Sequence, residues 1–158
     1  FAHMQFIAEK NGWTKFGSMQ NLYNLCYREE EREMNKFCNE TGVGLIPWGP
    51  LFSGLLAKPL GVESTRSKIS IAMSGGLTGA DKIIIERVQE VAERKGWKMG
   101  QVALAWVRGK GCIPIVGLTS SSIERLDEAC AVRDMRLSED EVKYLEEPYA
   151  PKPIIGHV

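Results

Sequence analysis

Apolar and charged positions recur along this chain with two different periods, and their order predicts the elements of its fold. A helical period of 3.6 residues is visible in four segments of the C-terminal half, at 80–96, 98–111, 121–134 and 137–148. Short apolar runs predict buried strands at 43–46 (VGLI) and 111–118 (GCIPIVGL). Because helices separate the strands, we expect an α/β fold with parallel strands covered by helices.

The N-terminal part of the chain continues this alternation with shorter elements. We expect a helix that ends at Asn11, a strand within 14–20 and a second helix over 27–42. On the second helix, Met34, Phe37 and Cys38 share the buried face, and the charge run REEERE is interpreted as the solvated face. Gly42 is the C-terminal stop that the pattern predicts.

Two capping boxes predict where the last helices begin. Ser121 is spaced for a reciprocal bond with Glu124, and Ser138 for one with Glu141. Between the middle strand and the following helix, residues 58–80 are rich in Gly and Ser. A stretch of this length is unusual inside a compact domain, so we expect a flexible loop there.

Composition excludes several classes of function. The chain has 158 residues, which fits one domain, and its 20 basic residues balance its 20 acidic ones. No overall field therefore favours nucleic acid or an anionic membrane. No apolar run approaches the ~20 residues of a membrane span, and the first residues lack the pattern of a signal peptide. Four scattered cysteines and two histidines form no zinc-site spacing, and they predict reduced thiols in a cytoplasmic protein without a metal.

Parallel α/β folds gather their chemistry at the C-terminal ends of strands, which singles out three segments. These are 18–21 (SMQN), 47–56 (PWGPLFSGLL) and 117–128 (GLTSSSIERLDE). In the first, Gln20 is suited to a carboxamide or is a satisfied structural amide. In the second, Trp48 is either a stacking platform for a planar ring or an ordinary core or surface indole.

The third segment has the composition of an anion site. Thr119 and Ser120 precede the start of a predicted helix, whose free N–H groups and dipole favour negative charge, and Arg125 falls in its first turn. Glu128, one turn later, is suited to hold Arg125 or to accept from a ribose or an adenine amine. The alternative is plain N-capping by serine, with Arg125 as a solvated charge.

Other catalytic patterns are absent from the sequence. It contains neither GxGxxG nor a P-loop, and two histidines near the chain ends build no Ser-His-Asp or Cys-His set. The tyrosines show no base or carboxylate partner at catalytic spacing; they are Tyr23, Tyr27, Tyr144 and Tyr149.

Four stretches together resemble the C-terminal half of an aldo-keto reductase, most closely the aryl-alcohol dehydrogenase-like subgroup. They are SMQNLYNLCYREEEREM, GVGLIPWGPLFSGLLAKP, IPIVGL and RLSEDEVKYLEEPYAPKPIIGH. The resemblance implies a partial (β/α)8 TIM barrel, in which residues 1–158 supply roughly the last three β/α units plus the C-terminal helix. It also implies an NADP(H)-dependent oxidoreductase that acts on aldehydes, ketones or aryl alcohols.

The same resemblance assigns roles in cofactor binding. Gln20 matches the residue that holds the nicotinamide carboxamide, and Trp48 matches the aromatic that stacks on the nicotinamide ring. Pro50, Leu51 and Ser53 fall in the loop that follows the pyrophosphate. The residues at the 2′-phosphate and adenine end are Thr119, Ser120, Arg125 and Glu128.

Two departures from the family pattern predict weak or lost NADP binding. Gly49 stands where the family usually has Ser, and Ser53 where it often has Arg. The family's catalytic Asp, Tyr, Lys and His match no residue here, so the chain is expected to be a piece of a longer enzyme and inactive alone. The alternative is a non-catalytic remnant or interaction module that pairs with an N-terminal half or a full-length relative. Open sheet edges would mediate such pairing, with four apolar side chains exposed beside them: Val43, Leu45, Ile113 and Ile115.

Overall fold

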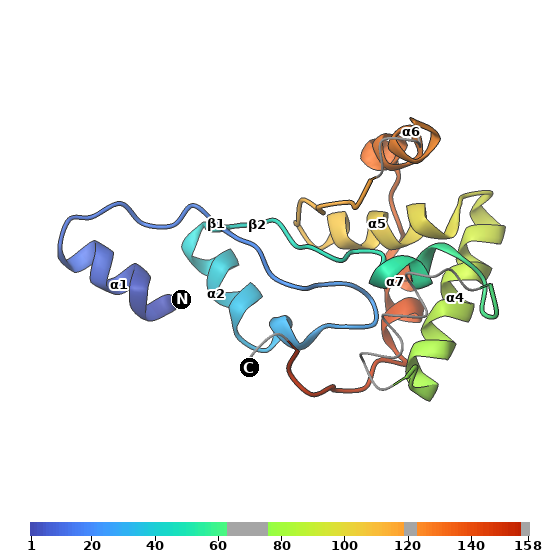
Figure 1. Cartoon of the computed structure of the whole chain (residues 1–158), viewed down its shortest axis with the longest axis horizontal. Helices are drawn as coiled ribbons and strands as arrows, with labels where there is room; N and C mark the ends of the chain where they lie inside the picture. Colours follow the sequence, from blue (N-terminus) through green and yellow to red (C-terminus); the bar gives the residue numbers. More distant parts are fainter. Residues whose placement is uncertain (63–75, 119–122, 156–158) are drawn as a thin grey trace.

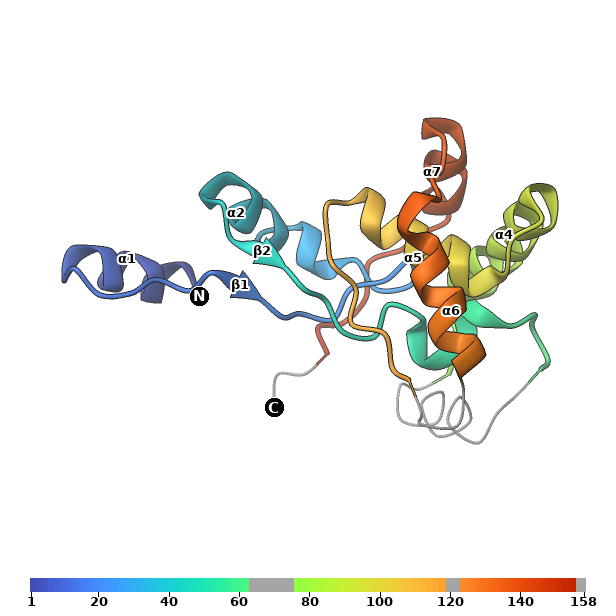
Figure 2. The same ribbon diagram turned by 90° about the horizontal axis from the view of Figure 1, so that it is seen from above.

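The computed structural model describes residues 1–62, 76–118 and 123–155, whose elements form two groups side by side (Figure 1). One group contains α1 (Ala2–Lys10), α2 (Met34–Thr41) and the short strands β1 (Ser18–Met19) and β2 (Gly44–Leu45). The other contains the packed helices α4 (Gly79–Lys95), α5 (Met99–Gly109) and α7 (Glu139–Glu146), with α6 (Ile123–Ala131) against α5 (Figure 2). Three 3-10 helices complete the description: η1 (Glu29–Glu31), η2 (Phe52–Ala57) and η3 (Val132–Asp134).

The strands run in parallel, as the alternation of elements predicts. β1 pairs with β2, with Met19 opposite Leu45. Beyond the strands, parallel bridges join Leu22 to Trp48 and Trp48 to Ile115. Three segments of the described chain therefore lie next to one another, in the order 18–22, 44–48 and 113–115.

The third of these segments is not the buried strand that its composition predicts. Ile113 and Ile115 are 70% and 42% exposed, and they take part only in backbone bonds and one bridge. The expectation that Val43 and Leu45 are exposed as well is wrong, because both are buried. Side chains alternate between the two faces of an extended segment, and an all-apolar run does not reveal which face is covered.

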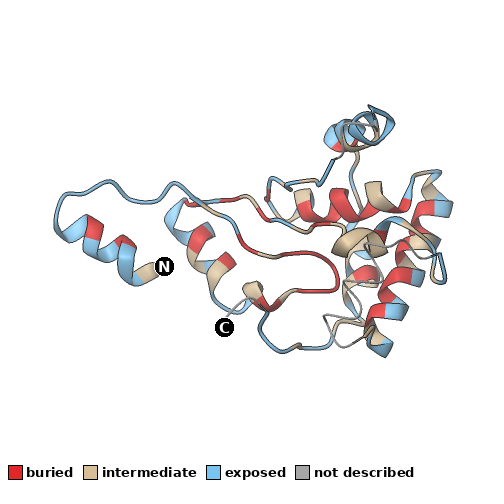
Figure 3. Cartoon of the chain, in the orientation of Figure 1, coloured by how far each residue is buried: buried red, intermediate tan, exposed pale blue. Residues whose placement is uncertain are grey.

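The hydrophobic core lies where α4, α5 and α7 meet (Figure 3). Ile84, Val88 and Val91 of α4 are completely buried, as their helical spacing predicts. Trp106 of α5 and Leu145 of α7 are buried against them. Loss of water contact by such side chains contributes about 1.5–3 kcal/mol each, so this contact is a substantial part of the stability of the chain.

Helix ends follow the predicted signals where they can be compared. Ser138 and Glu141 form the predicted capping box at the start of α7. α1 ends at Lys10 with Asn11 as its C-cap residue, and Gly42 ends α2 in the left-handed conformation, with φ 73°. The predicted box of Ser121 with Glu124 includes a residue outside the described ranges.

The predicted helix over 27–42 is divided into η1 and α2: its C-terminal part and its stop at Gly42 are confirmed, and its continuity through 32–33 is wrong. The charge run REEERE, which contains η1, is not simply solvated: Glu29 is 7% exposed and accepts hydrogen bonds from Tyr149 and from the backbone of Lys152, both at 2.7 Å. Because these acceptors must face inward, the backbone turns at 32–33 instead of continuing one helix.

Arg28 joins this turn to the helical core. Its guanidinium forms two hydrogen bonds with Glu31, at 2.9 and 2.7 Å, and one with Glu146 of α7 at 3.0 Å. It also lies over the rings of Trp106 and Tyr149, 5.7 and 5.2 Å from their centroids. Paired charges inside a partly buried cluster specify one arrangement, because loss of a single partner leaves a charge unsatisfied.

Three tyrosines have carboxylate partners that the sequence does not reveal. Tyr23 donates to Glu31 at 2.5 Å, Tyr149 to Glu29 and Tyr144 to Glu90. Burial and the bond to Glu31 raise the pKa of Tyr23 far above its ordinary value, so its hydroxyl stays protonated. These tyrosines act as structural donors.

The four thiols are free, as predicted, with Cys130 exposed and the other three buried. Within the described ranges, no helix is both long and apolar enough to cross a membrane. The same residues contain no group of His, Cys, Asp or Glu that could hold a metal ion.

We predict that acid weakens the fold through Glu31. Burial raises its pKa, but hydrogen bonds from Arg28 and Tyr23 outweigh burial and hold the pKa below its usual value. The stabilisation is therefore present above the unfolded pKa, about 4.3, and is lost as the pH falls through the folded pKa. The urea midpoint should decrease from about pH 6 to about pH 3.

The substitution Glu31→Gln should lower the free energy of unfolding at neutral pH by roughly 1–3 kcal/mol and flatten part of this pH dependence. Glu40→Gln is the matched control, since the Glu40 side chain is 64% exposed. Equal pH dependence in the wild type and Glu31→Gln would contradict the prediction.

Candidate functional site

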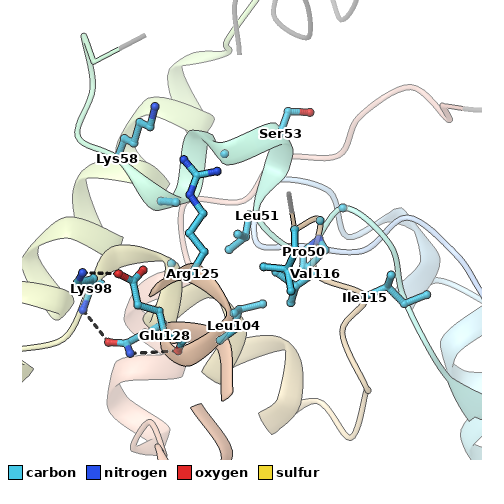
Figure 4. Close-up of a pocket in the computed structure, with 18 of the residues that line it drawn as sticks. Pro50, Leu51, Ser53, Lys58, Lys98, Leu104, Ile115, Val116, Arg125 and Glu128 are labelled. Atoms are coloured by element: carbon cyan, nitrogen blue, oxygen red, sulfur yellow. Dashed lines mark hydrogen bonds and ion pairs between the residues drawn. The ribbon is translucent and has the colours of Figure 1, made fainter. Parts of the chain in front are cut away.

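A cavity of about 580 Å³ lies between the turn after β2, η2, the N-terminus of α5, the segment 115–118 and α6 (Figure 4). Small-molecule sites in proteins range from roughly 300 to 1,000 Å³, so a sizeable ligand fits here. Its walls combine apolar side chains, such as Leu51 and Leu104, with the charged side chains of Lys58, Arg125 and Glu128.

The turn after β2 presents Trp48 at one end of the cavity. The backbone N–H of Trp48 donates to the carbonyl of Asn21 at 2.9 Å, and the indole is 49% exposed. Asn24 fixes the next residue, because its side-chain amide donates to the carbonyl of Gly49 at 2.9 Å. The backbone is thus held on both sides while one part of the indole remains accessible.

η2 forms the wall next to this indole. Phe52 and Ser53 have positive φ angles of 46° and 56°, and Gly54 follows at 89°. A left-handed conformation is costly for residues with a Cβ, so this turn is a local strain of the kind found at binding sites. Leu56, with 0% exposure, anchors the turn in the core.

The opposite end of the cavity is basic. Lys58, Lys98 and Arg125 line it together with one acid, Glu128. The Glu128 carboxylate is paired with the Lys98 ammonium, and this bond raises the pKa of Lys98. The spacing within the helix offered Arg125 as a partner for Glu128, but the partner in the structure is Lys98.

Arg125 has no ion-pair partner among the described residues. Its guanidinium extends from α6 across the cavity towards Lys58 and η2 (Figure 4). Two basic groups, Lys58 and Arg125, thus remain without a carboxylate partner in the described part of this site, which favours an anionic ligand.

The cavity brings most of the predicted site residues together. Its lining includes Trp48, Pro50, Leu51, Ser53, Arg125 and Glu128. Gln20 is exposed and does not line the cavity; the strand register places it opposite Ile46, two residues before Trp48. Thr119 and Ser120 lie outside the described residues.

Sequence reasoning missed the lysines of this site, because they do not follow a strand. One signal was available: Lys98 is the N-cap residue of α5, where a positive charge opposes the helix dipole. Its side chain instead bonds to Glu128, and Gln101 of α5 donates to the Glu128 carbonyl at 3.2 Å.

Comparison with known proteins gives the class to which this architecture belongs. The model of the aldo/keto reductase family matches residues 1–150. The crystal structure of the thermostable aldo-keto reductase Tm1743 with the inhibitor epalrestat superposes with a TM-score of 0.57 and 24% identity, over 83% of this chain and 39% of that one. This structure supports the fold alone.

The chain belongs to the aldo/keto reductase family, whose members are oxidoreductases that generally use NAD(P)H. It is 52% identical to aldo-keto reductase dtxS3 of Metarhizium robertsii, over 99% of this chain and 43% of the relative. It is 49% identical to a Schizosaccharomyces pombe protein provisionally named aryl-alcohol dehydrogenase, over 100% of this chain and 45% of that protein. The chain thus spans less than half the length of these relatives.

We predict that the family's usual Ser does not fit at Gly49. Gly49 has φ +66°, and a Cβ there would lie 2.8 Å from Leu22 Cδ1. Gly49→Ser should lower the free energy of unfolding by about 1–2 kcal/mol, measured by urea denaturation. Gly17→Ser is the matched control, because Gly17 has open space and no left-handed φ. Equal losses in both variants would disprove the prediction.

Proposed function

We propose that this chain forms the NADP(H)-binding half of an aldo-keto reductase that acts on aldehydes, ketones or aryl alcohols. The observation that carries the proposal is the cavity, which has an accessible indole at one end and, at the other, an arginine without an acidic partner in the described part of the chain. A nicotinamide dinucleotide with a 2′-phosphate has the matching chemistry: a planar ring at one end and an anion at the other.

Different residues of the chain would contact different parts of the cofactor. Trp48 would cover one face of the nicotinamide, with Gln20 beside it for the carboxamide. Pro50, Leu51 and Ser53 would follow the pyrophosphate. Arg125 and Glu128 would bind the 2′-phosphate and adenine end together with Thr119 and Ser120, and the lysines near Arg125 would add positive charge.

We also propose that residues 1–158 are the C-terminal half of a barrel domain, with roughly the last three β/α units and the C-terminal helix. The three parallel segments support this arrangement. Ile113 and Ile115, exposed on the open side, would then face the rest of the barrel. The free thiols support a reducing compartment such as the cytoplasm for this enzyme.

When bound, the cofactor supplies the hydride, and this chain holds and orients it. The indole of Trp48 would fix the ring plane and exclude water from one face. The resemblance gives tyrosine as the family's proton donor, yet the cavity lining in the described part of the chain includes no tyrosine. We propose, therefore, that the proton reaches the carbonyl oxygen from a group outside this chain, and that the chain alone is inactive.

The binding role predicts a preference for the phosphorylated cofactor. Calorimetric titration of the chain should show weak binding of NADP+, as Gly49 and Ser53 predict, and Arg125→Met should weaken it about 10- to 100-fold, with a much smaller effect on NAD+, since a charged hydrogen bond contributes roughly 1.5–3 kcal/mol. Arg133→Met is the control, because Arg133 is 81% exposed and paired with Asp134. Equal weakening of NADP+ and NAD+ would refute the assigned role of Arg125.

The lack of a proton donor predicts no turnover by the isolated chain. NADPH oxidation with an aromatic aldehyde should stay at the buffer rate at every protein concentration, because neither Tyr23 nor Tyr149 faces the cavity and each is bonded to a carboxylate. A rate of NADPH oxidation that increases in proportion to the concentration of the chain would show that the chain contains its own proton donor.

A further inference from the structure

We propose that Lys152 is a positioning residue for the cofactor-binding turn: from the C-terminal segment it holds η2 in the left-handed conformation that places Ser53 in the cavity wall. The inference rests on the proposed function, because it assigns the turn to cofactor binding. Lys152 lies about a hundred residues beyond η2 in the sequence, and it does not line the cavity itself.

Two contacts fix the ammonium group of Lys152. Its Nζ lies 2.5 Å from Oδ1 of Asp81, and the two side chains are 14% and 1% exposed. The same Nζ lies 5.1 Å from the centroid of the Phe52 ring. An ammonium held by a buried carboxylate has little freedom to leave the ring, and a desolvated cation–ring contact is stronger than an exposed one.

The carboxylate is itself fixed at the start of α4. Oδ2 of Asp81 accepts from the backbone N–H of Thr78 at 2.9 Å and from its hydroxyl at 2.8 Å. Oδ1 is thus the oxygen that faces Lys152. The pair joins the first turn of α4 to the C-terminal segment and brings both against η2.

The backbone around Lys152 is also held. Its N–H donates to Glu29 at 2.7 Å, and the hydroxyl of Tyr149 donates to the same oxygen at 2.7 Å. Three residues later, the N–H of Ile155 donates to the hydroxyl of Tyr27 at 3.1 Å. Because hydrogen bonds hold the chain on both sides of Lys152, the ammonium of Lys152 is confined to one position.

η2 needs such a restraint. Phe52 and Ser53 hold positive φ angles, which persist only where the surroundings determine them. Within the turn itself, the N–H groups of Gly54 and Leu56 both donate to the carbonyl of Leu51, at 2.9 and 3.2 Å. Lys152 adds a contact to the ring of Phe52, the first strained residue, and so stabilises the conformation of Ser53 next to it.

The experiment measures the turn and the cofactor separately. Amide hydrogen exchange at Gly54 and Leu56 is recorded in the full chain without cofactor, and the Kd for NADP+ is measured by calorimetry. The test variant is Lys152→Met, which keeps the length of the side chain and removes its charge. Lys152→Arg should restore the charge, and Lys143→Met is the control, since Lys143 is an exposed lysine of α7.

In Lys152→Met, exchange at Gly54 and Leu56 should accelerate on the order of tenfold, with a similar rise in the Kd for NADP+. Exchange in the core of α5 should stay unchanged, and Lys152→Arg should recover most of both effects. Phe52→Leu keeps the ion pair of Lys152 with Asp81 and removes the ring. Phe52→Leu should accelerate exchange in the turn to a similar extent, so it still tests the inference if Lys152→Met does not fold.

Unchanged exchange at Gly54 and Leu56 in both variants would overturn the inference, whatever the chain binds. Uniform acceleration across α4 and α5 would also overturn it, because it would show a general structural role. A loosened turn with an unchanged Kd would refute the link to the cofactor. Failure of the wild type to bind NADP+ would instead refute the proposed function, and with it the link to cofactor binding, while exchange still decides whether Lys152 holds the turn.

Discussion

The position of Arg28 between two carboxylates and two aromatic rings is the constraint on which the rest of the chain depends. Residues 21–28 leave the strands and enter the helical core with little regular structure of their own. A buried irregular segment is stable only if its polar groups find partners. Asn24 accepts from the N–H of Cys26 at 2.9 Å, and Arg28 closes the segment against α5 and α7. The strands, and with them Trp48, are thereby placed relative to the core.

Local signals predicted the helices well, because the residues that specify a helix lie close together in the sequence. The spacing of Ile84, Val88 and Val91 identifies the buried face of α4 without knowledge of its neighbours, and Ser138 caps α7 through a residue three positions away. The prediction of one continuous helix over 27–42 was wrong because contacts with distant residues decide the path of this segment. Arg28 and Glu29 bond to residues more than a hundred positions away in the sequence, so their inward direction cannot be read from the charge pattern.

The site shows the same division between local and distant information. The rule that ligands bind at strand ends pointed to Trp48 and Arg125, and both line the cavity. It could not find Lys58 and Lys98, since neither follows a strand and each reaches the cavity only through packing of η2 and α5. The partner of Glu128 was equally hidden, because Lys98 lies 30 residues earlier in the chain.

α6 carries Arg125 but contributes no buried residue to the core. Its attachment to α5 includes the bonds of Glu128 with Lys98 and Gln101 at the protein surface. Because α6 buries little, its docked position is less strongly stabilised than the positions of α4 and α7, and an anion that bound Arg125 would stabilise it. By thermodynamic linkage, any opening of α6 would reduce the apparent affinity for such an anion, and the bound anion would stabilise the helix in return. Substitutions on the outer face of α6 would therefore change the affinity for such an anion without touching the anion itself.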